Sequence, residues 1–294
     1  MGSRFSRVGI AGLGQIGGSM ALAFRLNQAP YSVSGFDIDD RLILAAKRRR
    51  MISDGFDSAV DLIENVDILI VALPMFAIHQ LLRENRKALD SKILVMDTGS
   101  TMQDVIKTAE NLKMTNFVGG HPYAGTEMIA PAAWNGKMFD NQAFFLSKPA
   151  KCGKKAYDRA LSLVRNIGAI PQDIDREDHD RMFAFASGLP HIIAYALVAS
   201  QADARRRKKI DWDFLAHSFA STTRVAKSSP QPVAQFLWQN RKHLKREIAI
   251  FKRKLEEFSE HLSQDTIEEF LSEISYLKQM KDNLERTDGP ITSR

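Results

Sequence analysis

Short runs rich in valine and isoleucine alternate with amphipathic stretches along the first half of the chain. The runs are bounded by glycine, aspartate or proline, as buried β-strands are, whereas the stretches between them have the apolar spacing of helices. This alternation predicts βαβ units and a doubly wound, mostly parallel sheet. The predicted strands are Arg7–Ala11, Ser32–Phe36, Asp67–Ala72, Lys92–Met96, Phe117–Val118, Ala143–Leu146 and Ile170–Ile174, and the predicted helices are Gly17–Gln28, Asp39–Arg50, Met75–Leu89, Met102–Leu112 and Lys154–Asn166.

The strand pattern stops near residue 175, which predicts an α/β domain over 1–175 and an all-helical domain over 176–294. Apolar residues from Leu244 to Leu262 follow a heptad-like spacing and form a seam, with Asp265 as the expected N-cap of a last helix. The seam indicates either a homodimer interface in the helical domain or the core of a single bundle. The helices are expected over Glu177–Phe185, His191–Ala204, Trp212–Lys227 and Ala234–Arg286.

Composition narrows the class of protein. The formal net charge of +6 suits either nucleic acid or an anionic metabolite, but no aromatic–basic motif supports nucleic-acid binding. Cys152 is the only cysteine, so a disulfide within the chain and a cysteine-based metal site are excluded. No apolar run reaches the length of a membrane span, and no signal-type segment precedes the first strand. We therefore expect a cytoplasmic protein that binds a small molecule and no metal, nucleic acid or membrane.

A glycine-rich motif between the first strand and the first helix predicts a dinucleotide site. Gly12–Gly17 reads G-x-G-x-x-G, and Asp37 follows Gly17 by 20 residues at the end of the second strand. In a Rossmann-type fold, such glycines let a pyrophosphate approach the helix N-terminus and such a carboxylate binds the ribose. Asp37 favours NAD over NADP, although Arg41 and Lys47–Arg50 are basic. The expected cofactor-binding residues are Gly12, Gly14, Gln15, Ile16, Gly17, Asp37, Leu73 and Pro74.

The strongest chemical signal is the segment Gly119–Glu127, which reads G-G-H-P-Y-A-G-T-E. Flanking glycine and proline place His121 on a shaped loop after the predicted strand Phe117–Val118. A neutral imidazole can act as a general base, which a hydroxyl oxidation coupled to hydride transfer needs. A turn histidine with a structural role is the alternative.

The segment resembles the H-P-x-A-G-[ST]-E signature of the prephenate/arogenate (cyclohexadienyl) dehydrogenase family. Several other motifs share this resemblance from about Val8 to Asn240. They are the cofactor loop Gly12–Ser19, the D-x-x-S segment Asp97–Ser100, the stretches Asp178–Arg181 and Leu189–His191, and Thr223–Ala226 with Ser229-Pro230.

The resemblance implies an NAD-dependent oxidative decarboxylation of prephenate or arogenate in tyrosine biosynthesis. It implies His121 and Ser100 as catalytic residues, Ser100 bonding the same substrate hydroxyl. Arg224 would bind a substrate carboxylate, and the remaining substrate-binding residues would be His191, Glu127 and Thr126.

Purely structural roles are the alternatives for these residues. Ser100 could cap the helix near Met102, His191 could be a core histidine, and Arg224 could make a structural ion pair. His179 is expected to brace the domain junction rather than to do chemistry.

The sequence departs from the family at Gly188 (usually His), Met102 (usually Lys) and Pro232-Val233 (usually Met-Trp), all expected near the pocket. An amino-substituted prephenate analogue as substrate, another Rossmann dehydrogenase and a non-catalytic NAD-binding protein are the alternatives. No mutase or regulatory domain is expected in these 294 residues.

Overall fold

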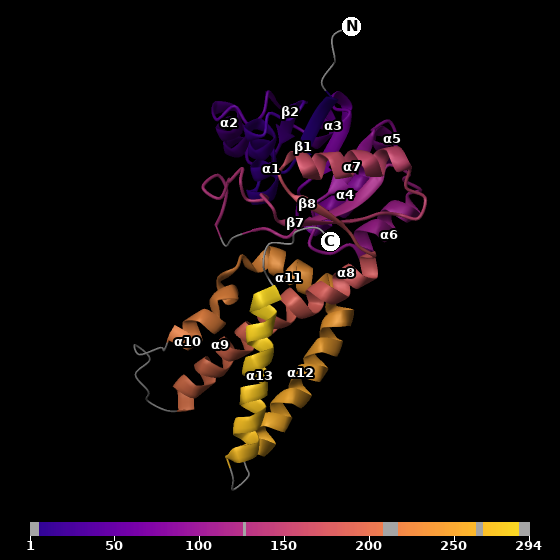
Figure 1. Cartoon of the computed structure of the whole chain (residues 1–294). Helices are drawn as coiled ribbons and strands as arrows, with labels where there is room; N and C mark the ends of the chain where they lie inside the picture. Colours follow the sequence, from indigo (N-terminus) through magenta and orange to yellow (C-terminus); the bar gives the residue numbers. More distant parts are fainter. Residues whose placement is uncertain (1–5, 126–127, 208–216, 263–266, 288–294) are drawn as a thin grey trace.

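The computed structural model describes residues 6–125, 128–207, 217–262 and 267–287. The first part of the chain forms an α/β region, and the remainder forms a set of long helices that extends from one end of it (Figure 1). The fold class predicted from the alternation of strands and helices is confirmed.

Eight strands form one sheet in the order β3-β2-β1-β4-β5-β6-β7-β8. All neighbouring strands are parallel except β6 and β7, which are antiparallel. The carboxyl ends of β1, β4 and β5 therefore meet at one edge, where ligands bind in open α/β sheets. The strands are β1 (Ser6–Ala11), β2 (Tyr31–Phe36), β3 (Asp54–Gly55), β4 (Ile68–Val71), β5 (Leu94–Asp97), β6 (Phe117–Pro122), β7 (Ala143–Ser147) and β8 (Ile170–Asp173).

Helices cover both faces of this sheet. Successive residues of a strand point to opposite faces, so Ile68 and Ile70 pack in one apolar cluster while Leu69 and Val71 pack in the other. The first face is covered by α1 (Gln15–Leu26), α2 (Asp40–Arg48) and α7 (Lys154–Asn166), and the second by α3 (Ala59–Asn65), α4 (Met75–Glu84), α5 (Arg86–Leu89) and α6 (Gln103–Asn111).

Four details differ from the sequence-based expectation. The two-residue strand β3 and helix α3 were not anticipated, and the predicted helix Met75–Leu89 is divided at Asn85. His121 lies within strand β6 and not on a loop, since β6 continues to Pro122 by antiparallel pairing with β7. The ladder pairs His121 with Phe145, so the histidine is held by sheet hydrogen bonding and not by a flexible turn.

The second half of the chain is helical. Asp175 caps α8 (Arg176–Phe183), which continues through the π-helical turn η1 (Ala184–Gly188) into α9 (Leu189–Arg207). A π-helical turn inside an α-helix is often found at functional sites. The expected cap Asp265 lies outside the described residues. The remaining elements are α10 (His217–Thr222), the 3₁₀ turn η3 (Arg224–Lys227), α11 (Pro230–Gln239), α12 (Arg241–His261) and α13 (Glu268–Thr287).

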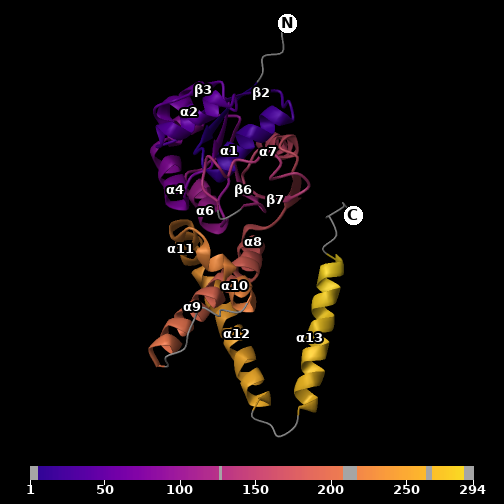
Figure 2. The same cartoon turned by 90° about the vertical axis from the view of Figure 1, so that its left-hand side faces the viewer.

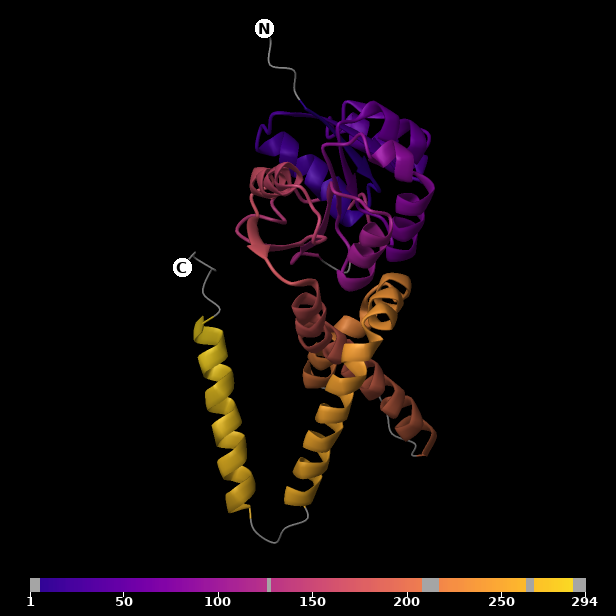
Figure 3. The ribbon, with the colours of Figure 1, turned by 90° about the vertical axis from the view of Figure 1, so that its right-hand side faces the viewer.

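Helices α12 and α13 diverge from one end like the arms of a V (Figures 2 and 3). Near that end Phe258 packs on Phe270 with ring centroids 6.2 Å apart, and His261 Nε2 lies 2.7 Å from a carboxylate oxygen of Glu273. Farther along, the seam is exposed at Leu255. Within the described part of one chain the seam is buried at Leu244 and half-buried at Ile248, Phe251 and Phe258, so a single chain covers it only in part.

Contrary to the sequence-based expectation that no apolar run reaches the length of a membrane span, one continuous helical stretch among the described residues, Arg176–Gln201, is long and apolar enough by length and composition alone. A core helix of a soluble protein meets the same criterion, so this is weak evidence. The stretch carries the buried pair His179 and Asp180, and its α9 part contacts η3 and α12.

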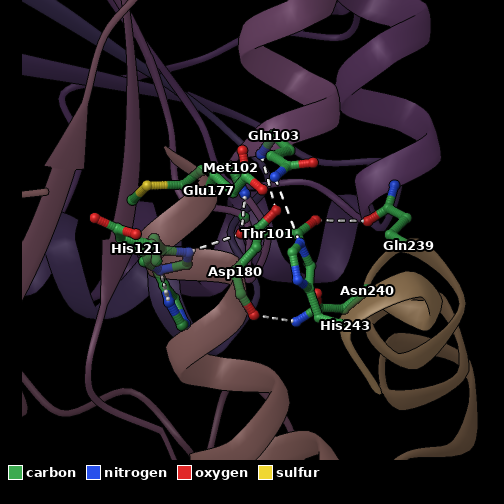
Figure 4. A network of polar contacts seen from close by, with 12 residues as sticks. Thr101, Met102, Gln103, His121, Glu177, Asp180, Gln239, Asn240 and His243 are labelled. Atoms are coloured by element: carbon green, nitrogen blue, oxygen red, sulfur yellow. Dashed lines mark hydrogen bonds and ion pairs between the residues drawn. The ribbon is translucent and has the colours of Figure 1, made fainter. Parts of the chain in front are cut away.

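The two halves of the chain are joined through the carboxylate of Asp180. Its oxygens accept hydrogen bonds from the backbone N–H groups of Met102 (2.8 Å) and Gln103 (2.9 Å) at the start of α6. Asn240 donates its side-chain amide to the backbone carbonyl of Asp180 at 2.7 Å (Figure 4). A carboxylate at a helix N-terminus satisfies orphan N–H groups and complements the helix dipole, so Asp180 fixes α8 against the sheet.

We predict that Asp180→Ala lowers the free energy of unfolding by roughly 3 kcal/mol or more, because it leaves several buried donors without an acceptor. The matched control is Asp178→Ala on the same helix, where an exposed carboxylate pairs with Arg181 and should contribute less than about 1 kcal/mol. Chemical denaturation of both variants measures the difference. Equal losses would mean that the Asp180 cap does not stabilise the domain junction.

Candidate active site

The glycine loop between β1 and α1 is shaped to receive an anion. Gly12 has φ +94, and a Cβ there would lie 2.2 Å from the carbonyl oxygen of Ala72. A Cβ on Gly17 would lie 1.9 Å from the carbonyl oxygen of Gly12, whereas one on Gly14 would meet nothing within 4 Å. No side chain caps α1 at Gly14, and no acidic residue lies in its first turn. The loop thus leaves open space above uncapped N–H groups, which fits a dinucleotide pyrophosphate.

Asp37 lies at this loop as the sequence predicts. Its carboxylate accepts hydrogen bonds from the backbone N–H of Leu13 at 2.7 Å and of Asp39 at 2.9 Å. Leu73 packs beside Gly12, because a Cβ on that glycine would come within 3.1 Å of a Leu73 methyl group. Arg41 makes two 2.8 Å hydrogen bonds with the Asp39 carboxylate. The Arg41 guanidinium is therefore already paired with a carboxylate. This pairing disfavours its use in binding the 2′-phosphate of NADP.

A cavity of about 530 Å³ lies between the sheet edge and the helical half. Four of the predicted site residues line it: Ser100 after β5, His121 on β6, His191 on α9 and Arg224 at the start of η3. Thr126 and Glu127 lie outside the described residues. The other lining residues are mainly apolar or small: Pro122, Tyr123, Ala124, Gly125, Phe183, Ala186, Ser187, Val225, Ser228, Pro232, Val233 and Phe236.

The cavity is next to the glycine loop. A Cβ on Gly125, which lines the cavity, would lie 3.4 Å from the side-chain oxygen of Gln15 in the first turn of α1. The structure thus brings the predicted chemical residues and the predicted cofactor residues to one place, although Gly12 and Arg224 are 212 positions apart in sequence.

His121 is held by a chain of hydrogen bonds. Its Nδ1 lies 2.9 Å from Nε2 of the buried His179, and Nδ1 of His179 lies 2.8 Å from a carboxylate oxygen of Asp180. The His121 ring also packs edge-on against Phe183, with centroids 4.6 Å apart. Burial, followed by the neighbouring His179, lowers the pKa of His121 well below its ordinary value. The imidazole is therefore neutral near pH 7.

Sequence reasoning missed the contact of His179 with His121. His179 was expected only to brace the junction, and the adjacent pair His179-Asp180 in the sequence was the signal available. Asp180 stabilises the junction between the two halves, and His179 contacts His121, the proposed base. The pair His179-Asp180 therefore has a structural role and also a contact in the site.

The alternative roles can be compared with the geometry. Asp180, not Ser100, accepts the hydrogen bonds of the first N–H groups of α6, so capping does not account for Ser100. His191 is half-buried and its Nδ1 lies 2.9 Å from the carbonyl oxygen of Ser187, which leaves Nε2 for the cavity.

Of the sequence departures, Pro232 and Val233 line the cavity. Met102 and Gly188 are buried outside its lining, with Gly188 against Leu244. Pro232-Val233 thus adjoin the cavity directly, whereas Gly188 follows the lining residue Ser187 and Met102 lies two residues after the lining residue Ser100.

Asp97 is a second buried carboxyl at this sheet edge. It accepts hydrogen bonds from the backbone N–H of Gly99 at 2.8 Å and of Gly120 at 3.3 Å. These bonds fix the turn that carries Ser100 and the strand that carries His121. Burial raises the pKa of Asp97 to about 7 against the opposing effect of the two N–H groups.

The doubly wound sheet, the open helix terminus and the histidine-lined cavity beside it define a dinucleotide-dependent dehydrogenase with a helical second half. Two family models cover the chain: "Prephenate dehydrogenase, nucleotide-binding domain" matches residues 20–171, and "Prephenate dehydrogenase, dimerization domain" matches residues 175–279. The chain belongs to the prephenate dehydrogenase family, and the resemblance seen in its motifs is confirmed.

Individual relatives agree with this assignment. The chain is 29% identical over 278 residues to prephenate dehydrogenase of Bacillus subtilis (strain 168), covering 94% of this chain and 75% of that protein. It is 29% identical over 238 residues to cyclohexadienyl dehydrogenase of Zymomonas mobilis, covering 80% of each. Among solved structures, Aquifex aeolicus prephenate dehydrogenase in complex with hydroxyphenyl propionate and NAD⁺ is similar, with a TM-score of 0.84, 26% identity, and coverage of 98% of this chain and 100% of that one.

The raised pKa of Asp97 predicts a pH dependence of stability. The folded protein holds the proton up to about pH 7, whereas the unfolded chain releases it near the ordinary value of 3.8. Asp97 therefore stabilises the fold at low pH, and this contribution falls by about 1.4 kcal/mol per pH unit between roughly pH 5 and 6.5, levelling off above 7.

Denaturation curves of the wild type and Asp97→Asn between pH 5 and 8.5 measure this effect. The difference between the two free energies of unfolding should change with that slope, because asparagine does not titrate. A difference that is constant with pH would show that Asp97 ionises normally.

Proposed function

We propose that this protein catalyses the NAD-dependent oxidative decarboxylation of prephenate or arogenate, giving 4-hydroxyphenylpyruvate or tyrosine. The observation that carries the proposal is the position of His121. One ring nitrogen of His121 is bound through His179 to Asp180, and the residue lines a cavity that adjoins the cofactor loop and is also lined by Ser100 and Arg224. Membership of the prephenate dehydrogenase family supports the same reaction.

The residues of the glycine loop fit NAD. Gly12, Gly14, Gln15, Ile16 and Gly17 would hold the pyrophosphate over the N-terminus of α1. Asp37 would bind the adenosine ribose, and Leu73 and Pro74 would lie along the dinucleotide. When bound, NAD accepts the hydride that leaves the ring carbon of the substrate. Asp37, together with the pairing of Arg41 to Asp39, supports NAD rather than NADP.

The hydrogen-bond chain sets which nitrogen of His121 is the base. The Asp180 carboxylate accepts from Nδ1 of His179, so that nitrogen carries a hydrogen. We propose that His179 carries no second hydrogen in this chain, so that its Nε2 has a lone pair and accepts from Nδ1–H of His121. This leaves a lone pair on Nε2 of His121, the nitrogen that faces the cavity.

His121 can therefore accept a hydrogen bond from the ring hydroxyl of the substrate. Its lowered pKa makes it a weak base for an alcohol. The hydroxyl becomes strongly acidic, however, as the hydride leaves its carbon, and at that point a weak base suffices. The ring carboxylate leaves as CO₂ and its electron pair makes the ring aromatic. The phenolate oxygen formed in this way takes the proton back from His121, so the protein supplies orientation and a group that accepts and returns one proton.

Arg224 would bind a substrate carboxylate, since a guanidinium matches a carboxylate through two parallel hydrogen bonds. Ser100 would bond the same hydroxyl as His121. We assign His191 to the side-chain end of the substrate and propose Thr126 and Glu127 as further substrate-binding residues. Phe183 and Phe236 would exclude water around the ring.

Turnover tests this function directly. Purified protein is offered prephenate and arogenate separately, each with NAD and with NADP, and formation of the reduced cofactor is followed by absorbance. Reduction of NAD with either acid supports the proposal, and the ratio of rates identifies the preferred acid. Cofactor binding without turnover on either acid would contradict it and would favour an amino-substituted analogue as substrate, or a non-catalytic NAD-binding protein.

We predict that His121→Asn lowers kcat by about 10²–10⁴-fold, which is the contribution expected of a positioned proton acceptor. The Kd of NAD should change little, because His121 is not one of the cofactor-loop residues. Steady-state rates and a binding titration measure the two quantities. An unchanged kcat would remove His121 from the mechanism.

We also propose that the chain divides between residues 175 and 176 and that residues 176–294 form a homodimer interface. The family model for the second half is a dimerization domain. Helices α12 and α13 form a V (Figures 2 and 3), and they carry exposed apolar side chains that a second copy would cover. We propose a cytoplasmic location, in keeping with a single cysteine and a small-molecule substrate. The exposed large apolar residues of α12, its C-cap and α13 are Ile250, Leu255, Leu262, Leu271, Ile274, Tyr276, Leu277, Met280 and Leu284.

We predict that Leu255→Asp converts a dimer of two 33.0 kDa chains into monomers, because a carboxylate would be buried in the interface. The control is Arg246→Asp, which lies nine residues earlier and half a turn away on the helix. Sedimentation velocity distinguishes the two masses. A Leu255→Asp protein that remains dimeric would place the interface elsewhere.

A further inference from the structure

Trp134 lies in the segment between β6 and β7, far from the glycine loop in sequence but packed against it in space. The side chain is buried. Its indole N–H is placed between two carbonyl oxygens of the loop, 2.9 Å from that of Leu13 and 3.0 Å from that of Gly14. No residue of the proposed mechanism explains this contact, and the glycine motif alone does not reveal it.

The consequence follows from the planarity of the peptide bond. The carbonyl of Leu13 shares a peptide plane with the N–H of Gly14, and the carbonyl of Gly14 shares one with the N–H of Gln15. In a trans peptide the C=O and N–H point in opposite directions. The Gly14 carbonyl also accepts a helical bond of α1 from the N–H of Gly18 at 3.0 Å, and the indole adds to that bond. With both carbonyls held on one side, the N–H groups of Gly14 and Gln15 point to the other side, where Gly14 is open.

The fourth glycine of the loop is explained by the same contact. A Cβ on Gly18 would lie 1.9 Å from Nε1 of Trp134, so only glycine lets the indole reach the loop. The next residue, Ser19, is buried, and its hydroxyl accepts a hydrogen bond from the backbone N–H of Asn135 at 3.0 Å. The G-G-S sequence near the start of α1 thus fits against Trp134 and Asn135.

The segment makes two further contacts that hold the indole in place. The guanidinium of Arg49, after α2, lies over the Trp134 ring at 5.2 Å from its centroid. At its other end, the carbonyl oxygen of Met128 accepts a hydrogen bond from the side-chain amide of Gln15 at 3.4 Å. The segment from Met128 to Asn135 therefore contacts the first turns of α1 and the carbonyl side of the glycine loop.

We propose that Trp134 is a positioning residue for the dinucleotide: it orients the loop N–H groups that bind the pyrophosphate. The inference rests on the proposed use of NAD. Because the loop is fixed before the ligand arrives, binding does not have to order it, and affinity rises accordingly. Trp134 acts on cofactor binding and does not take part in the steps at His121.

The test is Trp134→Phe, which keeps most of the ring and removes the N–H donor. The Kd of NADH, measured by equilibrium titration of its fluorescence, and the KM for NAD should each rise roughly three- to tenfold, the effect of one lost hydrogen bond. The values of kcat and of KM for the acid substrate should stay within about twofold, and the unfolding temperature should change by only a few degrees. Trp238→Phe, at an exposed tryptophan on α11 that stacks on Arg241, is the matched control.

If Trp134→Phe does not fold, Ser19→Ala replaces it, because that change releases Asn135 and leaves the indole intact. It should weaken NADH binding in the same direction. An unchanged Kd of NADH would overturn the inference, as would a parallel change of kcat, both KM values and the unfolding temperature, which marks a purely structural residue. Wild-type protein that binds no NADH would instead refute the proposed cofactor, so the two failures are distinguishable.

Discussion

The carboxylate of Asp180 is the group on which both the assembly of the two halves and the geometry of the site depend. It accepts two backbone N–H groups of α6 and the imidazole N–H of His179, at distances between 2.8 and 2.9 Å. A buried charge is costly unless hydrogen bonds satisfy it, and here these bonds come from both sides of the junction. The junction and the orientation of His179, and through it of His121, are therefore set by one group.

This arrangement explains why a histidine is placed within a β-strand. Backbone pairing with β7 fixes the position of His121, and the bond to His179 fixes the rotation of its ring. The aromatic neighbour Phe183 removes water from one side and helps to keep the ring neutral. A neutral, oriented and weakly basic imidazole suits a reaction whose substrate becomes acidic only as hydride leaves. We infer that the protein contributes mainly positioning, at His121 through Asp180 and at the cofactor loop through Trp134.

Much of this molecule was predictable from sequence because its signals are local. The strands are short β-branched runs, and Gly12–Gly17 with Asp37 forms a compact motif, so the sheet and the cofactor loop were expected where they lie. The lining of the cavity by Ser100, His121, His191 and Arg224 followed from family resemblance, not from periodicity. The missed features join residues far apart in the chain: Asp180 lies 78 residues from Met102, and Trp134 lies 121 from Leu13. No local pattern shows which distant carbonyl or N–H a side chain will meet.

The central claim is that the hydrogen-bond chain leaves the lone pair of His121 on Nε2, and nitrogen-15 NMR of histidine-labelled protein tests it most directly. Spectra of the wild type, with assignments from the His121→Asn and His179→Gln variants, show which ring nitrogens carry hydrogen. The account predicts that Nδ1 is protonated and Nε2 is not, in both His121 and His179, near pH 7. A His121 with its hydrogen on Nε2 and a bare Nδ1 would contradict the account, because the proton order would run the other way and the cavity would meet a donor instead of a base.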